Sequence, residues 1–113
     1  GMDGSRQESF NVEESILSPV AQAARLFVLG EDAGSAGTLA RLEAAGLRFG
    51  EHEPIVRQAA EAFRVGLFYR KSAGNADISP RQLQKFDQLL LKRAFESVRG
   101  FLSLTGSIFC EGQ

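Results

Sequence analysis

Few side chains in this 113-residue sequence could do chemistry, and they lie far apart along the chain. The single histidine, His52, stands between Glu51 and Glu53, a group that could hold a metal ion if the three side chains converged. Adjacent residues point in different directions, however, and a structural zinc site needs about four converging ligands. A solvated, acidic start of a helix, favoured by the helix dipole, explains the group better. We therefore expect no metal site.

Nucleophilic and phosphate chemistry have little support. A serine or cysteine nucleophile needs a positioned base, and His52 is the only histidine. Neither glycine-rich phosphate loop, G-x-x-x-x-G-K or G-x-G-x-x-G, occurs. Gly34 and Ser35 are similar to the Gly-Ser turn of nucleotidyltransferase active sites, but no paired carboxylates follow to hold metal ions. We expect no catalytic residue and no cofactor in this chain, and we interpret Cys110 as incidental.

Basic residues in the second half could bind an anion or an acidic partner. They lie in two rows on predicted helical faces. Arg57, Arg64 and Lys71 follow a seven-residue spacing, and Arg81, Lys85, Lys92 and Arg99 line the polar face of the last predicted helix. Such rows are most often solvated faces with ion pairs such as Arg57 with Glu61 and Lys92 with Glu96. The alternative is a docking surface, formed by Lys85, Lys92 and Arg99, for nucleotide phosphates or an acidic partner.

Composition describes one soluble globular domain. The chain is 43% hydrophobic and 24% charged, with no apolar run long enough to span a membrane. One cysteine cannot form an internal disulfide and no secretory signal is visible, so we expect a cytoplasmic location. The net charge of -1 combines about -5 through Glu53 with +4 after it. A total near zero argues against general nucleic-acid binding and leaves local anion binding open.

Three prolines mark expected helix starts. Helices are predicted from Pro19 to about Leu29, with a possible helical lead-in before it, then a short one around residues 38–49, and one from Pro54 to about Ser72. Their expected inward-facing residues include Val20, Ala24, Phe27, Leu39, Leu42, Leu47, Ile55, Val56, Ala59 and Phe63. The small residues around Gly66 suit close helix packing, and no strand pattern appears.

The last predicted helix starts at Pro80, with Ser79 as its cap and Gln82 at the capping-box position. Its apolar stripe is long: Leu83, Phe86, Leu90, Ala94, Phe95, Val98, Phe101, Leu102, Thr105, Ile108 and Phe109. The predicted fold is therefore all-α, an antiparallel up-and-down bundle of about four helices with a long C-terminal helix. We expect the bundle to cover residues 11–110, and residues 1–10 to be a tag remnant and a disordered tail.

Five sequence pieces, in order and spacing, resemble one domain family. They are Leu17-Ser18-Pro19-Val20 with Ala24-Arg25-Leu26; Thr38-Leu39-Ala40-Arg41-Leu42; Glu61-Ala62-Phe63-Arg64 with Leu67 and Arg70; Asn75 with Ile78-Ser79-Pro80; and Leu89-Leu90-Leu91-Lys92-Arg93-Ala94-Phe95. Over roughly residues 14–109 the chain resembles the nucleotidyltransferase substrate-binding domain, the C-terminal DUF294 family. This domain follows cyclic-nucleotide-binding, CBS and nucleotidyltransferase domains in bacterial signal-transduction proteins related to the protein-PII uridylyltransferases.

The resemblance implies a non-catalytic helical bundle that packs beside a nucleotidyltransferase catalytic domain and helps form the acceptor site. The catalytic partner would use a nucleoside triphosphate and a divalent metal such as Mg²⁺, and this chain would be either an excised domain or a free-standing subunit. Carried over from the family, the candidate substrate- or partner-binding residues are Arg25, Thr38, Arg41, Arg64, Arg70 and Asn75. Thr38 could instead cap the second helix, and Asn75 could instead shape a turn. The segment from Glu31 to Gly37 departs from the family pattern, with Gly37 in place of a polar residue.

Two other functions stay open. One is a dimerisation or adaptor bundle, with a possible homodimer formed through exposed Phe68, Tyr69 or Phe101. The other is a small helical ribonuclease with an Arg-x(4 to 6)-His motif. Arg48 and His52 are separated by only three residues, which counts strongly against that motif.

Overall fold

The structure, a computed structural model, describes residues 10–32 and 34–109. Four α-helices dominate it: α1 (Ser18–Phe27), α2 (Ser35–Arg48), α3 (Glu53–Ala73) and α4 (Lys85–Phe109). Three short helical turns accompany them: η2 (Glu13–Leu17), η3 (Gly50–His52) and η4 (Pro80–Gln82). Two short strands are β1 (Phe10–Asn11) and β2 (Asp77–Ile78). The predicted all-α bundle with a long last helix is confirmed.

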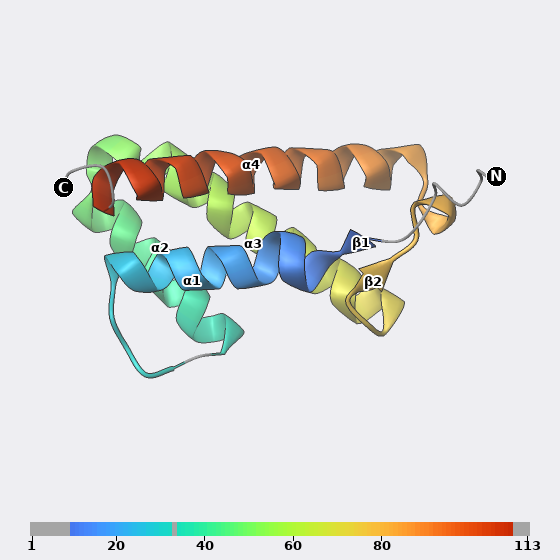
Figure 1. Cartoon of the computed structure of the whole chain (residues 1–113), viewed down its shortest axis with the longest axis horizontal. Coiled ribbons are helices and arrows are strands. Elements are labelled where there is room, and N and C mark those ends of the chain that lie inside the picture. Colours follow the sequence, from blue (N-terminus) through green and yellow to red (C-terminus); the bar gives the residue numbers. More distant parts are fainter. Residues whose placement is uncertain (1–9, 33, 110–113) are drawn as a thin grey trace.

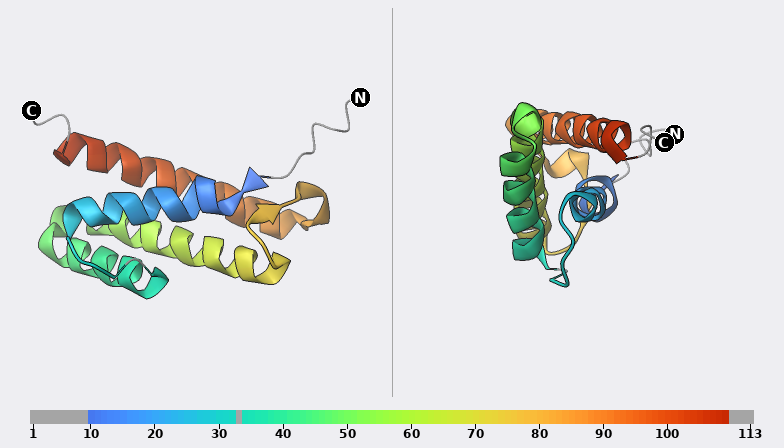
Figure 2. Two further views of the ribbon diagram at one scale, coloured as in Figure 1. Left: turned by 60° about the horizontal axis from the view of Figure 1, so that its bottom comes forward. Right: turned by 90° about the vertical axis from the view of Figure 1, so that its left-hand side faces the viewer.

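The two longest helices, α3 and α4, form the backbone of the bundle. They run antiparallel and pack against each other more extensively than any other pair of elements. Helix α1 lies beside α4, and α2 packs against both α3 and α1 (Figures 1 and 2). One side of α4 therefore faces α1 and another faces α3, while its remaining surface is exposed to solvent.

The turn η2 leads directly into α1 and sits closely against α3. This approach requires a glycine, because a Cβ atom at Gly66 would lie 2.9 Å from Cδ2 of Leu17 and 3.0 Å from Cγ2 of Ile16. Both of these side chains are buried, at 2% and 0% exposure. The prediction of close packing near Gly66 is confirmed.

The two strands correct the prediction that no strand would form. They pair antiparallel, with Phe10 opposite Ile78 and Asn11 opposite Asp77. Phe10 thus belongs to the fold, one residue before the predicted bundle boundary, and its ring packs edge-on against Phe95 with the centroids 5.3 Å apart. The rest of the predicted tail, residues 1–9, lies outside the described residues. A two-residue strand is too short to produce a readable alternating pattern.

Phenylalanines close the end of the core where α1 finishes. The ring of Phe27 stacks on Phe101 at 5.7 Å and meets Phe49 and Phe109 edge-on at 5.3 and 4.9 Å. Phe101 is completely buried. Its predicted availability for a self-interface is therefore wrong, and the same holds for Tyr69, which is only 5% exposed.

The start of the last helix differs from the prediction. Pro80–Gln82 form a separate 3₁₀ turn, Leu83 is extended, and α4 begins at Lys85. The hydroxyl of Ser79 makes no capping hydrogen bond. Instead Oδ2 of Asp87 accepts the backbone N–H of Gln84 at 3.1 Å. A carboxylate inside the first turn thus reaches back to the backbone N–H just before the helix, which is the second half of a capping box.

Several residues predicted to face inward are exposed instead. Phe86 is 70%, Leu102 40%, Leu47 82% and Ile55 36% exposed. The predicted apolar stripe on α4 was wider than the surface that α1 and α3 cover. None of the described helices is long and apolar enough to cross a membrane.

Candidate functional site

The predicted binding residues divide between two ends of the molecule. Arg25 lies in the last turn of α1, and Thr38 and Arg41 lie in α2. Arg70 and Asn75 lie at the opposite end, where α3 finishes (Figure 1). The structure therefore does not gather the candidate residues into one pocket.

Arg41 has the most unusual surroundings of the predicted residues. It is 5% exposed, although arginine is rarely buried without a partner. Its Nε and Nη1 atoms are buried and have no hydrogen-bond partner among the described residues. The third nitrogen, Nη2, lies against the connection between α1 and α2, since a Cβ atom at Gly30 would be 3.0 Å from it.

Thr38 lies one turn before Arg41, on the same face of α2. It is 2% exposed, and its Oγ1 donates to the carbonyl oxygen of Gly34 at 3.4 Å. The alternative that Thr38 caps this helix is wrong, because the helix begins at Ser35 with Gly34 as its cap residue. Thr38 and Arg41 together form a buried polar pair inside the bundle.

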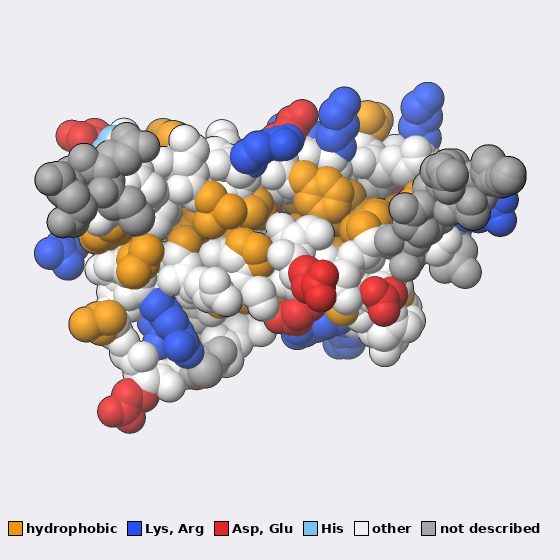
Figure 3. All heavy atoms as spheres, viewed as in Figure 1, with side chains coloured by type: hydrophobic (Ala, Val, Ile, Leu, Met, Phe, Trp, Pro, Cys, Tyr) orange, Lys and Arg blue, Asp and Glu red, His pale blue; other side chains and the backbone are white. Residues whose placement is uncertain are grey.

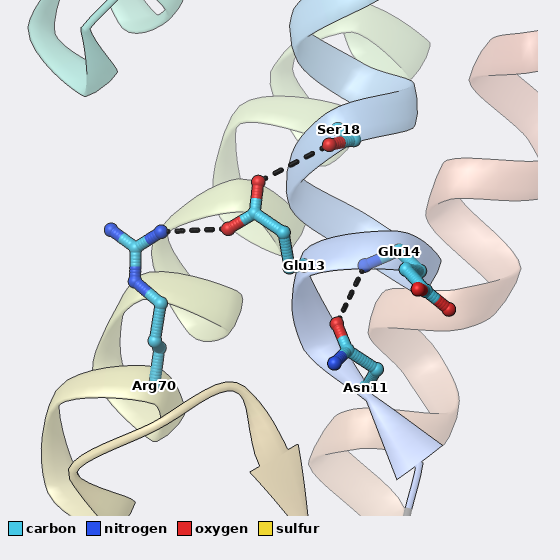
Figure 4. Close-up of polar contacts among 5 residues, drawn as sticks. All are labelled: Asn11, Glu13, Glu14, Ser18 and Arg70. Atoms are coloured by element: carbon cyan, nitrogen blue, oxygen red, sulfur yellow. Dashed lines mark hydrogen bonds and ion pairs between the residues drawn. The ribbon is translucent and has the colours of Figure 1, made fainter.

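Arg70 is engaged in a contact that the sequence did not reveal. Figure 4 shows its Nη1 donating to Oε1 of Glu13 at 2.8 Å, while Oε2 of Glu13 accepts from Ser18 Oγ at 3.2 Å. Asn11 Oδ1 accepts the backbone N–H of Glu14 in the same region. Arg70 and Glu13 are each about two-fifths exposed, so this is a partly solvated ion pair. It connects η2 to α3 across 57 residues of sequence.

Asn75 shapes the turn after α3, which was the predicted alternative to a role in binding. Its Oδ1 accepts the backbone N–H of Asp77 at 2.7 Å. The left-handed position of the turn belongs to its neighbour Gly74, with φ of 80°. This turn positions β2 for pairing with β1.

Arg25 and Arg64 are exposed. Arg64 lines the outer groove between α2 and α3, where Glu61 and Arg57 also lie. The predicted pair of Arg57 with Glu61 is replaced by one with Glu53, from Arg57 Nε to Glu53 Oε2 at 3.3 Å. Glu53 and Glu61 each lie four residues from Arg57, and the predicted partner, Glu61, was the wrong one.

The three residues predicted to form a docking row all lie on α4. Lys85, Lys92 and Arg99 are exposed and follow a seven-residue spacing along one side of the helix. No ion pair involves them within residues 10–32 and 34–109. Basic side chains project along the α4 edge of the face drawn in Figure 3.

The docking row borders an apolar groove between α1 and α4. Ala23 and Leu26 line it from α1, and Leu102, Thr105 and Gly106 line it from α4. Arg99 and Leu102 line its continuation toward Phe10 and Phe95. Figure 3 shows hydrophobic side chains exposed along the middle of this face. The sequence prediction missed this groove, because it assigned the whole apolar side of α4 to the core.

The His52 cluster does not converge. His52 Nε2 lies 3.1 Å from Oε2 of Glu51, while Glu53 pairs with Arg57. Among the described residues no three His, Cys, Asp or Glu side chains are close enough to share a metal ion.

The sequence matches one family model across residues 1–109, nearly its whole length. That family is described as "Putative nucleotidyltransferase substrate binding domain". The chain belongs to this family. No curated protein and no solved structure matches it significantly.

Membership of the nucleotidyltransferase substrate-binding family confirms the resemblance found in the sequence. The family's name implies association with a nucleotidyltransferase catalytic domain and is consistent with an accessory role for this one. The glycine at position 37, at the start of α2, has a local structural reason. A Cβ atom there would lie 2.6 Å from the backbone oxygen of Asp32. The connection before α2 therefore fills the space that a side chain at position 37 would need.

Proposed function

We propose that this chain is a non-catalytic substrate-binding domain or subunit of a bacterial nucleotidyltransferase system. In this role it packs beside the catalytic domain and helps form the site for the acceptor. The observation that carries the proposal is the family match over residues 1–109. The resemblance to proteins related to uridylyltransferases supports the finer assignment to a cytoplasmic, uridylyltransferase-like signalling system. The nucleoside triphosphate and Mg²⁺ would then be held by the catalytic partner.

The α1–α4 groove is the surface best suited to the catalytic domain. Leu26 and Leu102 are 52% and 40% exposed, and covering a leucine fully is worth about 1.5–3 kcal/mol. The row formed by Lys85, Lys92 and Arg99 would orient an acidic edge of the partner, because charges at an interface rim mainly accelerate and orient encounter. An apolar centre with a charged rim is the usual anatomy of a protein interface.

Binding to the catalytic domain tests this proposal. The nucleotidyltransferase domain encoded in the same or the neighbouring reading frame is purified and titrated with this chain by calorimetry. We expect a one-to-one complex that Leu26→Asp and Leu102→Asp weaken at least about tenfold, which corresponds to about 1.4 kcal/mol. Leu47→Asp is the matched control, since Leu47 is 82% exposed and lies on α2, outside the groove.

The charged row has its own signature in the binding kinetics of the same complex, measured by rapid mixing. Lys92→Glu with Arg99→Glu is expected to slow association and reduce its salt dependence, with a smaller effect on dissociation. Equal affinity for every variant would exclude the α1–α4 groove as the docking surface. Metal-dependent nucleotide transfer by the purified chain alone would overturn the non-catalytic role.

Self-association is the second candidate, and one observation favours it. Phe68 and Phe86 are 60% and 70% exposed. They lie on the paired helices α3 and α4 next to Tyr69 and Asp87, which are hydrogen-bonded to each other. Light scattering of the wild type and of Phe68→Ser with Phe86→Ser tests this possibility. A dimer that the double variant converts to a monomer would support it, and a monomeric wild type would exclude it.

A further inference from the structure

The buried guanidinium of Arg41 lacks the partner that such a group requires. Arginine stays protonated in proteins, and burying an unpaired charge is expensive. Yet Nε and Nη1 have no hydrogen-bond partner in the described part of the chain. Since Nε carries one hydrogen and Nη1 carries two, three N–H donors are unused.

Among residues 10–32 and 34–109, no nearby carboxylate supplies the missing charge. Asp32, in the connection before α2, uses Oδ1 to accept the backbone N–H of Gly34 at 2.9 Å. Its side chain packs against Gly37, where a Cβ atom would lie 2.8 Å from Asp32 Cγ. Glu31 and Glu43 are exposed, and neither forms an ion pair or hydrogen bond with Arg41. The acidic groups of this region therefore leave Arg41 unpaired.

The guanidinium lies directly beneath the surface. Gly30 is exposed and has no side chain, and a Cβ atom there would lie 3.0 Å from Nη2 and 3.5 Å from Nε of Arg41. The backbone of Gly30 does not have a positive φ, so no backbone strain requires glycine there. Because position 30 carries no side chain, none covers the Nη2 and Nε edge of the guanidinium from the solvent side, in the connection that follows α1 (Figure 1).

We propose that Arg41 binds a phosphate group that enters beside Gly30, between the α1–α2 connection and α2. A guanidinium grips two oxygens of a phosphate or carboxylate as a fork, but a phosphate monoester brings up to two negative charges to the unpaired cation where a carboxylate brings one. Thr38, buried one turn before Arg41 on the same face, places a hydroxyl nearby. The biological meaning rests on the proposed function, in which the phosphate would belong to the nucleotide or the acceptor. Binding itself requires only this chain.

Thermal unfolding of the full chain, titrated with ligand at constant ionic strength, tests the site. The probes are inorganic phosphate, UMP and uridine, with acetate as the carboxylate. We expect the melting temperature to rise saturably with phosphate or UMP and not with uridine or acetate. A response to inorganic phosphate alone would indicate a free-phosphate site, whereas a stronger response to UMP would indicate a nucleotide.

Two variants separate the site from general charge effects. Arg41→Met should weaken phosphate binding at least about tenfold, and without phosphate it should fold as stably as the wild type or more so, because it removes an unpaired buried charge. Gly30→Val keeps the charge and places a side chain against the Nη2 and Nε edge of the guanidinium, and should weaken binding by a similar factor. Arg81→Met removes an exposed arginine of η4 and should change binding less than about twofold.

Three results would overturn the proposal: no phosphate-dependent rise in the wild type, an equal rise in Arg41→Met, or a rise with acetate alone. If Arg41→Met fails to fold, Gly30→Val decides, because unchanged phosphate binding in that variant would contradict the site. The proposed function is tested separately. A chain that binds its catalytic domain but no phosphate would refute only the Arg41 site.

Discussion

At the scale of single residues, Tyr69 makes the contact with the clearest titration signature. Its hydroxyl donates to Oδ1 of Asp87. Burial, this hydrogen bond and the negative charge of Asp87 together raise the pKa of Tyr69 from 10.0 to about 12. Each of these effects opposes formation of the phenolate in the folded chain.

Alkaline titration should follow this shift directly, because Tyr69 is the only tyrosine and there is no tryptophan. The absorbance of the phenolate should appear near pH 12 in the wild type and at lower pH in Asp87→Asn. The folded state holds the proton more tightly than the unfolded state. Its stabilising effect is therefore complete below about pH 10 and lost as the pH rises toward 12. A wild-type pKa at 10 would contradict the buried contact.

Two glycines in long helices should respond oppositely to alanine. Gly66→Ala should destabilise the fold by about 1–3 kcal/mol, because its Cβ would meet Leu17 at 2.9 Å. Gly100→Ala on α4, with no atom within 4 Å of its Cβ, should stabilise it by about 0.5–1 kcal/mol. Urea denaturation of both variants measures this difference. Equal effects would show that η2 does not pack against α3 as described.

Predictions for single residues were most accurate where a side chain contacts residues next to it in the sequence. Asn75 shapes its turn as the sequence suggested, since an Asx turn involves only adjacent residues. The burial of Arg41 beneath the α1–α2 connection and the pairing of Arg70 with Glu13 depend on how separate elements pack. No local sequence pattern could have predicted the burial of Arg41 or the ion pair of Arg70 with Glu13.

At the scale of elements, α4 carries the main revision. Proline at position 80 does start a helical turn, but the chain becomes extended at Leu83 before α4 begins. The Ser79-Pro80 pair predicts a helix start. A helix does start there, but it is a turn of only three residues. The competing capping residue, Asp87, lies inside the apolar-periodic run and was therefore assigned to the helix body.

Capping variants should distinguish the two possible starts of the last helix, at Pro80 and at Lys85. Asp87→Ala should cost about 1–2 kcal/mol, since it removes the acceptor of the Gln84 N–H and of the Tyr69 hydroxyl. Ser79→Ala should change the free energy of unfolding by less than about 0.5 kcal/mol, because Ser79 makes no capping bond. Chemical denaturation provides both values. A larger cost for Ser79→Ala than for Asp87→Ala would favour the original assignment.

The exposed side of α4 shows why the α1–α4 groove escaped prediction. Periodicity identifies which residues share a face, but only the neighbouring helices decide how much of that face is covered. Here α1 and α3 cover the middle of the apolar stripe and leave Phe86 and Leu102 in solvent. Exposed apolar side chains next to basic ones are typical of interaction surfaces.

At the scale of the whole molecule, the bundle is an elongated body of 47 × 27 × 22 Å. Its two candidate surfaces serve different roles in our account. The groove between α1 and α4 would hold the catalytic domain, and Arg41 beneath the α1–α2 connection would bind a phosphate group. A domain that docks with one surface and binds substrate with another fits an accessory role.

Nucleotide transfer measures the central claim most directly. The catalytic domain is incubated with Mg²⁺, each radiolabelled nucleoside triphosphate in turn and an extract containing the acceptor, with and without this chain. We expect labelling of the acceptor, with UTP preferred, only when both proteins are present, and loss of labelling with Leu26→Asp and Leu102→Asp together. Labelling by the catalytic domain alone at the same rate would contradict the account.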